Sequence, residues 1–421
     1  MILYIGITAA AVLAAVIVNK EEGRPSRSRG GLLRRSCLVL IALLLIVPAA
    51  LRQETGNDYL RYVEFFHLAS IDAYVPTEPG FNLLVKAIYS LCGYENYLLV
   101  FAVYAVGTVV LMLTALRQQA EDFAFSFFLF MMFGYYFQSF NTMRYYFALS
   151  IALTAMTCLL KRSYPAFVLL VLLAAAFHKS ALTVFVLYPL CICRWRRLHR
   201  GLAAALGCAV LMLHERVLDL LVALYPSWEG TTDLAAGTRV SWVNILRCAG
   251  VLLLAVLVQR RDAAEEMPPF RQRQLRMYIN GSFLGLLLYV FGWFIPEVSR
   301  ICYYLTFTQV FLLPMLLHRI PDEDAQTRTA EKSEAAAQGE AKKEAKKEAK
   351  KEARGGILAS AARSAGAVRS KRGLLTALVL AAAMLYFALL LRTADRETIK
   401  LLPYKSFLFH DLNQTPSGSV E

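Results

Sequence analysis

The sequence has few charged residues: they make up 18% of its 421 positions, whereas 57% of the positions are hydrophobic. A soluble globular chain carries about a quarter charged residues, so this composition excludes a soluble enzyme and a secreted disulfide scaffold. Eight cysteines are present, but none forms a Cys-x-x-Cys pair, which argues against zinc and redox chemistry. Neither a Walker-type phosphate loop nor a His-Glu-x-x-His motif occurs. We therefore expect no metal and no other cofactor.

Long apolar runs are what the sequence has instead. About 20 apolar residues in a helix cross the roughly 30 Å of a bilayer core, and helices satisfy their own backbone there. The predicted fold is therefore an all-α polytopic integral membrane protein with about 12 transmembrane helices. The predicted spans are residues 2–18, 36–51, 97–116, 124–140, 145–160, 166–177, 181–193, 202–213, 240–258, 278–296, 301–317 and 374–391.

Other segments do not fit a simple alternation of spans. Residues 58–70, within an outer loop over 52–80, have the apolar spacing of an amphipathic helix in the membrane interface. Residues 81–91 are apolar but too short to cross. A Lys/Glu/Ala repeat fills a linker that we expect to be cytoplasmic and solvated. The predicted organisation is a transmembrane core (1–320), this low-complexity linker (321–372), a last transmembrane helix (373–392) and an extracytoplasmic tail (393–421).

The net charge of +14 could indicate a nucleic-acid partner, but its distribution argues against one. Lys and Arg are concentrated in alternate loops, which is the pattern of loops retained in the cytoplasm. An even number of spans places both termini on one side, so we expect both to be extracytoplasmic. The basic excess therefore indicates orientation, and no nucleic-acid partner is predicted.

Polar side chains gather in the loops that this topology places at the outer face. An arginine inside the membrane costs several kcal/mol unless it is paired, so Arg144, between aromatic residues, is a candidate for function. Each member also has an ordinary explanation: Arg52 as a flanking charge, Asp58 as a helix N-cap, His178 as a structural histidine, Arg300 as a snorkelling side chain. The candidate residues are Arg52, Asp58, Tyr59, Tyr62, Glu78, Gln138, Arg144, His178, Arg300, Tyr303 and Tyr304, with Arg247 inside the ninth span.

The polar side chains belong to short sequence blocks that follow one another along the chain. These are Arg52-x3-Gly56-x-Asp58-Tyr59-x2-Tyr62, Glu78-Pro79-Gly80-Phe81, Gln138 to Arg144, His178-x-Ser180-Ala181, Ser299-Arg300-x2-Tyr303-Tyr304 and Leu402-Pro403-Tyr404. Taken in order, these blocks resemble the EpsG-like family of bacterial exopolysaccharide membrane proteins, which are similar in role to Wzy-type polysaccharide polymerases. The chain departs from similar proteins in one block, where Tyr145 follows Arg144 in place of a glutamine.

The resemblance implies a glycosyltransferase of the bacterial cytoplasmic membrane. It would extend exopolysaccharide or capsule repeat units carried on polyprenyl diphosphate at the outer face, beside membrane lipid and other assembly proteins. Arginine forks suit the diphosphate, and a base must take the proton of the acceptor hydroxyl. We expect Arg52, Arg144 and Arg300 to bind the diphosphate, Gln138 and Arg247 to contribute to substrate binding, and Tyr59, Tyr62, Tyr303 and Tyr304 to stack sugar rings. The base would be His178, Asp58 or Glu78, with His178 favoured because a neutral imidazole accepts a proton near pH 7.

Two other functions stay open. A flippase or exporter of the same lipid-linked oligosaccharide needs a site at the bilayer midplane and often inverted repeats, and no internal repeat is evident. A membrane O-acyltransferase modifying the polysaccharide would use His178 as its base, and no accompanying acid motif is evident.

Overall fold

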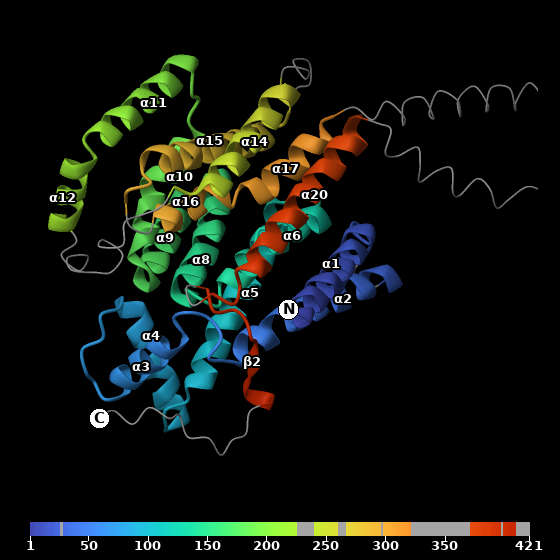
Figure 1. Cartoon of the computed structure of the whole chain (residues 1–421). Helices are drawn as coiled ribbons and strands as arrows, with labels where there is room; N and C mark the ends of the chain where they lie inside the picture. Colours follow the sequence, from blue (N-terminus) through green and yellow to red (C-terminus); the bar gives the residue numbers. More distant parts are fainter. Residues whose placement is uncertain are drawn as a thin grey trace, which may run out of the picture.

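The computed structural model describes residues 1–25, 28–224, 240–259, 267–295, 298–320, 371–396 and 399–409. Within these ranges the chain is almost entirely helical (Figure 1). Six helical stretches there are long and apolar enough to cross a membrane, or up to seven if a bent pair of helices counts as one span. The six are α1 (Ile2–Lys20), α2 (Arg29–Ala50), α5 (Tyr97–Gln119), α8 (Met143–Leu160), α16 (Val298–Thr306) with α17 (Gln309–His318), and α20 (Lys371–Arg392).

The prediction of an all-α multi-pass membrane protein is confirmed, but the count of 12 spans is not. Every predicted run is at least partly helical, yet several helices are too short: ten residues rise only about 15 Å, half of a bilayer core. The run over 124–140 breaks near Gly134, and the helix begun at Arg197 bends by 81° after Met212. The remaining helices are α6 (Phe123–Met132), α7 (Tyr135–Gln138), α9 (Tyr164–Phe177), η1 (Lys179–Thr183), α10 (Val184–Ile192), α11 (Arg197–Met212), α12 (His214–Leu224), α14 (Trp242–Gln259), α15 (Pro269–Phe291) and η3 (Phe407–Phe409).

Local sequence explains where several helices begin. The side-chain oxygens of Ser28, Asn96 and Asp122 accept hydrogen bonds from backbone amides in the first turns of α2, α5 and α6. Such caps satisfy amides that have no partner inside the helix. Proline occupies the first turn of α15, where its missing N–H costs nothing.

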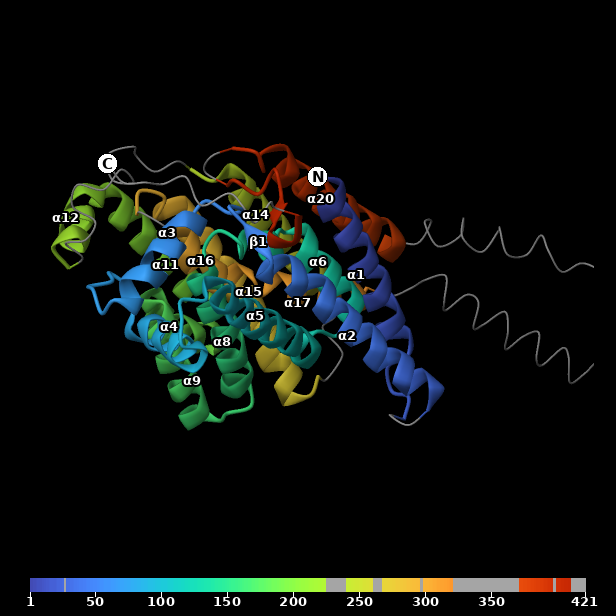
Figure 2. The ribbon, with the colours of Figure 1, turned by 90° about the horizontal axis from the view of Figure 1, so that it is seen from below.

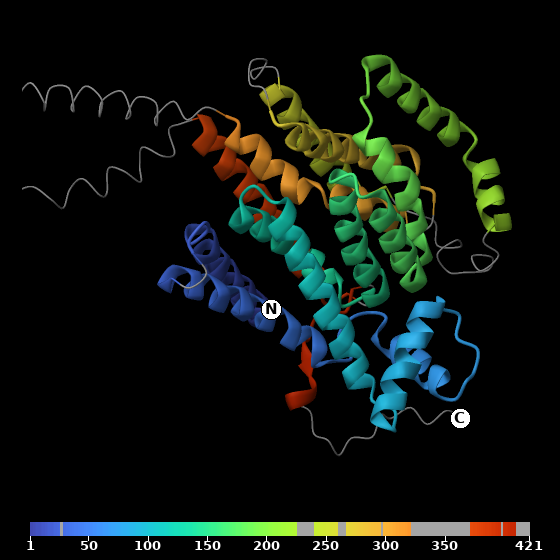
Figure 3. The same ribbon diagram turned by 180° about the vertical axis from the view of Figure 1, so that it is seen from behind.

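Helix α8 lies at the centre of the bundle and is buried along most of its length. It packs between α5 and α9, and its alanines at 148, 152 and 155 are fully buried, which lets the neighbouring helices approach closely. Seen from behind, α5 crosses between the α1–α2 pair and α8 (Figure 3). Helix α20 lies on the rim, with only Ala383, Phe387 and Leu391 buried.

Two short helices close one end of the bundle, which we call the α3–α4 end: α3 (Tyr59–Ser70) and α4 (Pro79–Cys92). Figure 2, which looks from below, shows α4 in front of α8 and α9; α4 packs on α9, and α3 packs on α4. Neither qualifies as a membrane span. Helix α3 buries Tyr59, Tyr62, Phe65 and Phe66, whereas Val63 is only half-buried.

The start of α1, the end of α2 and the segment after α20 also meet at the α3–α4 end. The Tyr4 hydroxyl donates to the Leu401 carbonyl over 2.6 Å. Strand β1 (Arg52–Gln53) pairs antiparallel with β2 (Lys405–Ser406). The predicted linker falls almost wholly in residues 321–370, and the end of the tail in 410–421, both outside the described residues.

Candidate functional site

The predicted polar side chains come from four segments that are far apart in sequence and meet at the α3–α4 end. Glu78 lies at the N-cap position of α4, and Arg144 lies in the first turn of α8. His178 stands at the break between α9 and η1, and Arg300 lies in the first turn of α16. Because each residue sits at or beside a helix end, the charged groups collect where the bundle meets its α3–α4 cover.

Arg144 and Glu78 form the ion pair at the middle of this site. The Arg144 Nη1 atom lies 2.5 Å from Glu78 Oε2, and the two side chains are only 17% and 14% exposed. The other carboxylate oxygen, Oε1, accepts the backbone N–H of Lys179 over 3.0 Å. A pair so shielded is coupled more strongly than a surface salt bridge, so Glu78 ties α4, α8 and η1 together.

Aromatic rings and a close helix contact hold Arg144 in place. Its Cζ atom lies 5.3 Å from the centre of the Phe81 ring and 5.8 Å from that of Tyr62. A Cβ at Gly80 would come within 2.6 Å of the Ala176 carbonyl oxygen, so only glycine lets α4 approach α9 this closely. The Glu78-Pro79-Gly80-Phe81 block therefore supplies the acid, the helix start, the close contact and the ring.

His178 begins a short polar chain directed at α16. Its Nδ1 atom lies 2.7 Å from the Ser180 hydroxyl, which in turn lies 3.2 Å from the Tyr304 hydroxyl. The His178 ring is 5.4 Å from that of Tyr145, at an angle of 81°. The Tyr145 hydroxyl donates to the Arg300 carbonyl over 2.6 Å. Tyr145 of α8 therefore contacts both the His178 ring and the main chain of Arg300.

The surroundings of His178 keep its imidazole neutral. Burial, followed by the positive charges of Arg300, Arg144 and Lys179, lowers the pKa of His178 from 6.5 to about 3. Because Nδ1 also accepts the Ser180 backbone N–H over 3.4 Å, the neutral ring carries its proton on Nε2. An imidazole in this tautomer donates a hydrogen bond from Nε2, a geometry that suits an anion better than a hydroxyl proton.

The Arg52 side chain is more deeply buried than its predicted role, binding of the diphosphate, requires. Its side chain is 3% exposed, and its Cζ atom lies 4.7 Å from the Phe101 ring centre and 5.2 Å from that of Phe140. It donates to the Ala49 carbonyl and lies against the sulfur of Met143. Burial lowers the pKa of Arg52 to about 10, which leaves it charged at neutral pH. To reach a lipid phosphate, the guanidinium would have to leave this ring stack.

The predicted sugar-stacking tyrosines differ in accessibility. Tyr59 is buried against Phe101 with its ring centre 4.8 Å away, and Tyr62 is equally buried. Tyr304 is fully buried, whereas Tyr303 keeps part of its surface. Only Tyr303 therefore offers an accessible ring without rearrangement.

Asp58 and Gln138 flank these groups. Asp58 is partly exposed and occupies the N-cap position of α3, but its side chain does not cap the helix. Gln138 is also partly exposed, and its side-chain oxygen accepts the Tyr146 hydroxyl over 3.0 Å. Both side chains lie at the solvent-facing edge of the site.

Arg247 lies apart from the Arg144–Glu78 pair, inside α14. Its Cζ atom is 5.0 Å from the Phe133 ring centre and 5.4 Å from that of Tyr386. The guanidinium contacts rings of α20 and of the turn after α6. No ion pair is found for it among the described residues.

Sequence reasoning omitted Tyr145 and Ser180 from the candidate site residues, although both lie in the quoted blocks. Tyr145 directly follows Arg144, and Ser180 follows His178 by two positions, so their positions within the blocks were the available signal. The Lys179 backbone N–H left no signal in the sequence, because a main-chain donor is independent of residue type. Within the described ranges, no group of three or more His, Cys, Asp or Glu side chains could hold a metal ion.

The fold and site define a multi-pass, all-α membrane protein with a cationic, aromatic site at one end of its helices. The chain belongs to the EpsG family, whose sequence pattern matches residues 35–328 and so includes every candidate residue. This confirms the resemblance and supports, in general terms, a polymerase-like membrane function connected with exopolysaccharide. No curated protein and no solved structure matches the chain.

Proposed function

We propose that this protein is a glycosyltransferase that extends polysaccharide repeat units carried on polyprenyl diphosphate at the outer face of the bacterial cytoplasmic membrane. The observation that carries the proposal is the convergence of Arg144, His178 and Arg300 at one end of the bundle. A lipid-linked substrate presents its diphosphate at the depth where membrane-spanning helices end. Two guanidinium groups and the N–H of a neutral imidazole can all donate hydrogen bonds to that diphosphate.

The orientation follows from the loops at the opposite end of the bundle. That end carries the basic turns at 19–35, 161–163 and 194–200, which the positive-inside rule assigns to the cytoplasm. The α3–α4 end then faces outward, together with the start of α1 and the segment after α20. Reporter fusions after Arg200 and after Arg276 should both report the cytoplasm.

In the proposed reaction the donor diphosphate is bound by Arg144 and Arg300, and Nε2–H of His178 donates to one of its oxygens. The acceptor hydroxyl oxygen forms a bond to the anomeric carbon of the donor sugar, while the bond from that carbon to the diphosphate oxygen breaks. Negative charge develops on the leaving diphosphate, so donors placed there stabilise the transition state more than the ground state.

The proton of the acceptor hydroxyl needs a base, and Asp58 suits this role best. Both oxygens of Glu78 are occupied by Arg144 and the Lys179 amide, and the His178 ring presents Nε2–H. Asp58 is partly exposed and lies one helical turn before Tyr62, whose ring contacts Arg144. We assign Arg52 a positioning role beneath this site, and Tyr303 the accessible ring for a sugar.

Reconstitution tests the function. Purified protein in liposomes receives a synthetic repeat unit on polyprenyl diphosphate, and product length is followed by gel electrophoresis and mass spectrometry. We expect products of two or more repeat units without other assembly proteins. The matched control is Arg61→Lys, a change at an exposed arginine on α3, which should elongate like the wild type.

The alternatives give different products in the same vesicles. Movement of the substrate across the bilayer without elongation would contradict the proposal and indicate a flippase. Acylation of the sugar from an added acyl donor, again without elongation, would indicate an O-acyltransferase.

A further inference from the structure

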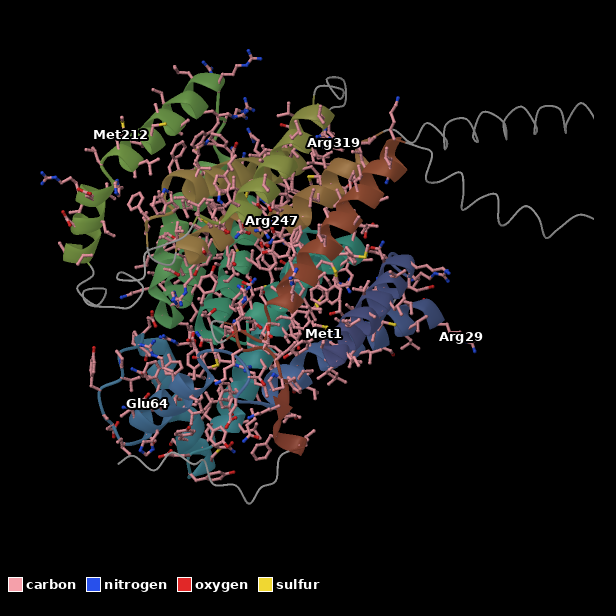
Figure 4. The ribbon with its side chains drawn as sticks, in the orientation of Figure 1. Met1, Arg29, Glu64, Met212, Arg247 and Arg319 are labelled. Atoms are coloured by element: carbon pink, nitrogen blue, oxygen red, sulfur yellow. The ribbon has the colours of Figure 1, made fainter. Side chains whose placement is uncertain are left out.

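Arg247 is a buried cation for which the described residues provide no counter-charge. Its Nε, Nη1 and Nη2 atoms are all buried and have no hydrogen-bond partner among those residues. Figure 4 places Arg247 in the middle of the bundle, whereas Glu64 lies at its edge. Arg247 is the sixth residue of α14, about 8 Å along the helix from its start. A charged side chain at that depth costs several kcal/mol unless a partner compensates it.

Three buried hydroxyls lie close to Arg247. Those of Tyr135 and Tyr289 are near enough to interact electrostatically with the guanidinium. The Thr306 hydroxyl lies beside Tyr135, close enough for their side chains to hydrogen-bond to each other. Buried polar groups are nearly always hydrogen-bonded in native proteins, so a guanidinium without a partner among the described residues, beside hydroxyls that could donate to a ligand, indicates a missing ligand. We call Arg247, Tyr135, Tyr289 and Thr306 the Arg247 cluster.

The composition of this cluster indicates the class of ligand. It offers a guanidinium and three hydroxyls, all able to donate, and none of its members is acidic. A guanidinium fork binds phosphate through two parallel hydrogen bonds, and hydroxyl donors can reach the remaining oxygens of a tetrahedral group. A planar carboxylate would leave some of these donors unused.

The cluster adjoins the site around Arg144, since the Tyr135 ring lies 5.8 Å from that of Tyr303, but it consists of different residues. Its residues lie on α14, α7, α15 and α16, and the rings of Phe133 and Tyr386 cover the guanidinium. Tyr386 belongs to α20, which is buried along only a small part of its length. Rotation of the Tyr386 ring would admit a ligand from the lipid at the rim of the bundle.

We propose that the Arg247 cluster binds the phosphate group of a membrane lipid, as a second phosphate site inside the bundle. The phosphate comes from a phospholipid or, if the proposed function holds, from a polyprenyl diphosphate. Arg247 lies about 8 Å along α14 from its start, so a lipid phosphate would reach the cluster by entering about one and a half helical turns into the bundle.

Lipid binding to the full-length protein tests the proposal. Protein purified in dodecyl maltoside is titrated with radiolabelled phosphatidylglycerol and, separately, with radiolabelled polyprenyl diphosphate; the matching polyprenol is the phosphate-free probe. Losing a charge-assisted fork weakens binding about tenfold or more, so Arg247→Gln should lower the affinity for at least one phosphate lipid by that factor. Arg117→Gln is the matched control, since it removes an exposed arginine at the opposite end, 6.0 Å from the Phe123 ring, and should bind as the wild type does.

A comparison of the two phosphate lipids shows which of them supplies the phosphate that the cluster binds. Loss of phosphatidylglycerol binding supports a phospholipid site, and loss of polyprenyl diphosphate binding in Arg247→Gln beyond that in Arg144→Gln supports a substrate site. Tyr289→Phe removes one hydroxyl and keeps the ring, so it should weaken binding about threefold to tenfold even if Arg247→Gln fails to fold.

Equal binding of both phosphate lipids by wild type, Arg247→Gln and Tyr289→Phe would overturn the proposal, as would equal binding of the phosphate-free polyprenol. The readout is binding, whereas the proposed function is read as elongation. A protein that binds phosphate at Arg247 but does not elongate would therefore contradict only the latter.

Discussion

Arg144 and Arg247 occupy two contrasting sites in the same bundle. Each guanidinium lies near two aromatic rings, yet among the described residues only Arg144 has an acid beside it, with Glu78 at 2.5 Å. Arg144 lies in the first turn of α8 next to the α3–α4 end, whereas Arg247 lies within α14 beside buried hydroxyls. The contrast teaches that an intramembrane arginine marks a site, while its neighbours decide whether its charge is already paired before a ligand binds.

The sharpest test of this contrast is Arg144→Lys, which keeps the positive charge but removes the guanidinium group and its paired N–H donors. Removing one preorganised donor to a developing oxyanion costs about 100-fold to 1,000-fold in rate, so long polymer should disappear. Polymer length in liposomes measures it, and thermal unfolding checks that the variant is folded. Arg247→Lys should reduce elongation less. Normal long polymer from Arg144→Lys would refute the role assigned to this arginine.

Arg52 tests whether burial alone makes an arginine functional. Arg52→Ala removes a guanidinium packed between two rings and its hydrogen bond to Ala49, which should lower the free energy of unfolding by about 2–3 kcal/mol. Thermal unfolding in detergent measures the change. Arg61→Ala, at an exposed arginine 5.4 Å from the Phe65 ring, should stay within about 0.5 kcal/mol of the wild type. A folded Arg52→Ala protein of full stability without activity would instead favour direct binding of diphosphate.

The pH dependence of stability reports how strongly burial and the nearby positive charges lower the pKa of His178. Its pKa of about 3 lies below the ordinary 6.5, so between these values the unfolded chain binds a proton that the folded protein does not. Its contribution to stability is therefore complete above pH 6.5 and is lost as pH falls below it, with a slope of at most about 1.4 kcal/mol per pH unit.

Unfolding temperatures between pH 7 and 5 measure this slope. His178→Gln should flatten it, and Arg144→Gln should reduce it by removing one of the nearby positive charges. Arg247→Gln and the exposed control His199→Gln should leave it unchanged. An unaltered slope in His178→Gln would show that the imidazole is not held neutral.

The smallest expected effect concerns Tyr145, whose ring lies 5.4 Å from that of His178 and 6.5 Å from that of Tyr303. Tyr145→Phe keeps the ring and removes the hydrogen bond to the Arg300 carbonyl, which should cost about 1 kcal/mol of stability. Elongation should fall by more than in Tyr164→Phe, a control at an exposed tyrosine of α9. Equal activity of the two variants would show that this hydrogen bond does not position Arg300.

Sequence patterns predicted the helical class and the chain segments of the site, because apolar runs and intramembrane charges carry large local free energies. They overestimated the number of spans, since hydropathy does not register the bend after Met212 or the break near Gly134. They named Glu78 and Arg144 separately, 66 positions apart, but could not pair them. Nor could they distinguish Arg52, packed between rings, from an arginine at the site.

By itself, the sequence determined that this chain is a multi-pass helical membrane protein of the EpsG family with arginines, acids and a histidine beside its helix ends. Only the tertiary structure decided that Glu78 pairs with Arg144, that His178 presents Nε2–H, and that the buried Arg247 guanidinium has no partner among the described residues. The physical reason is that hydropathy is a property of contiguous residues. Charge compensation and the tautomer of a histidine depend on contacts between residues that only folding brings together.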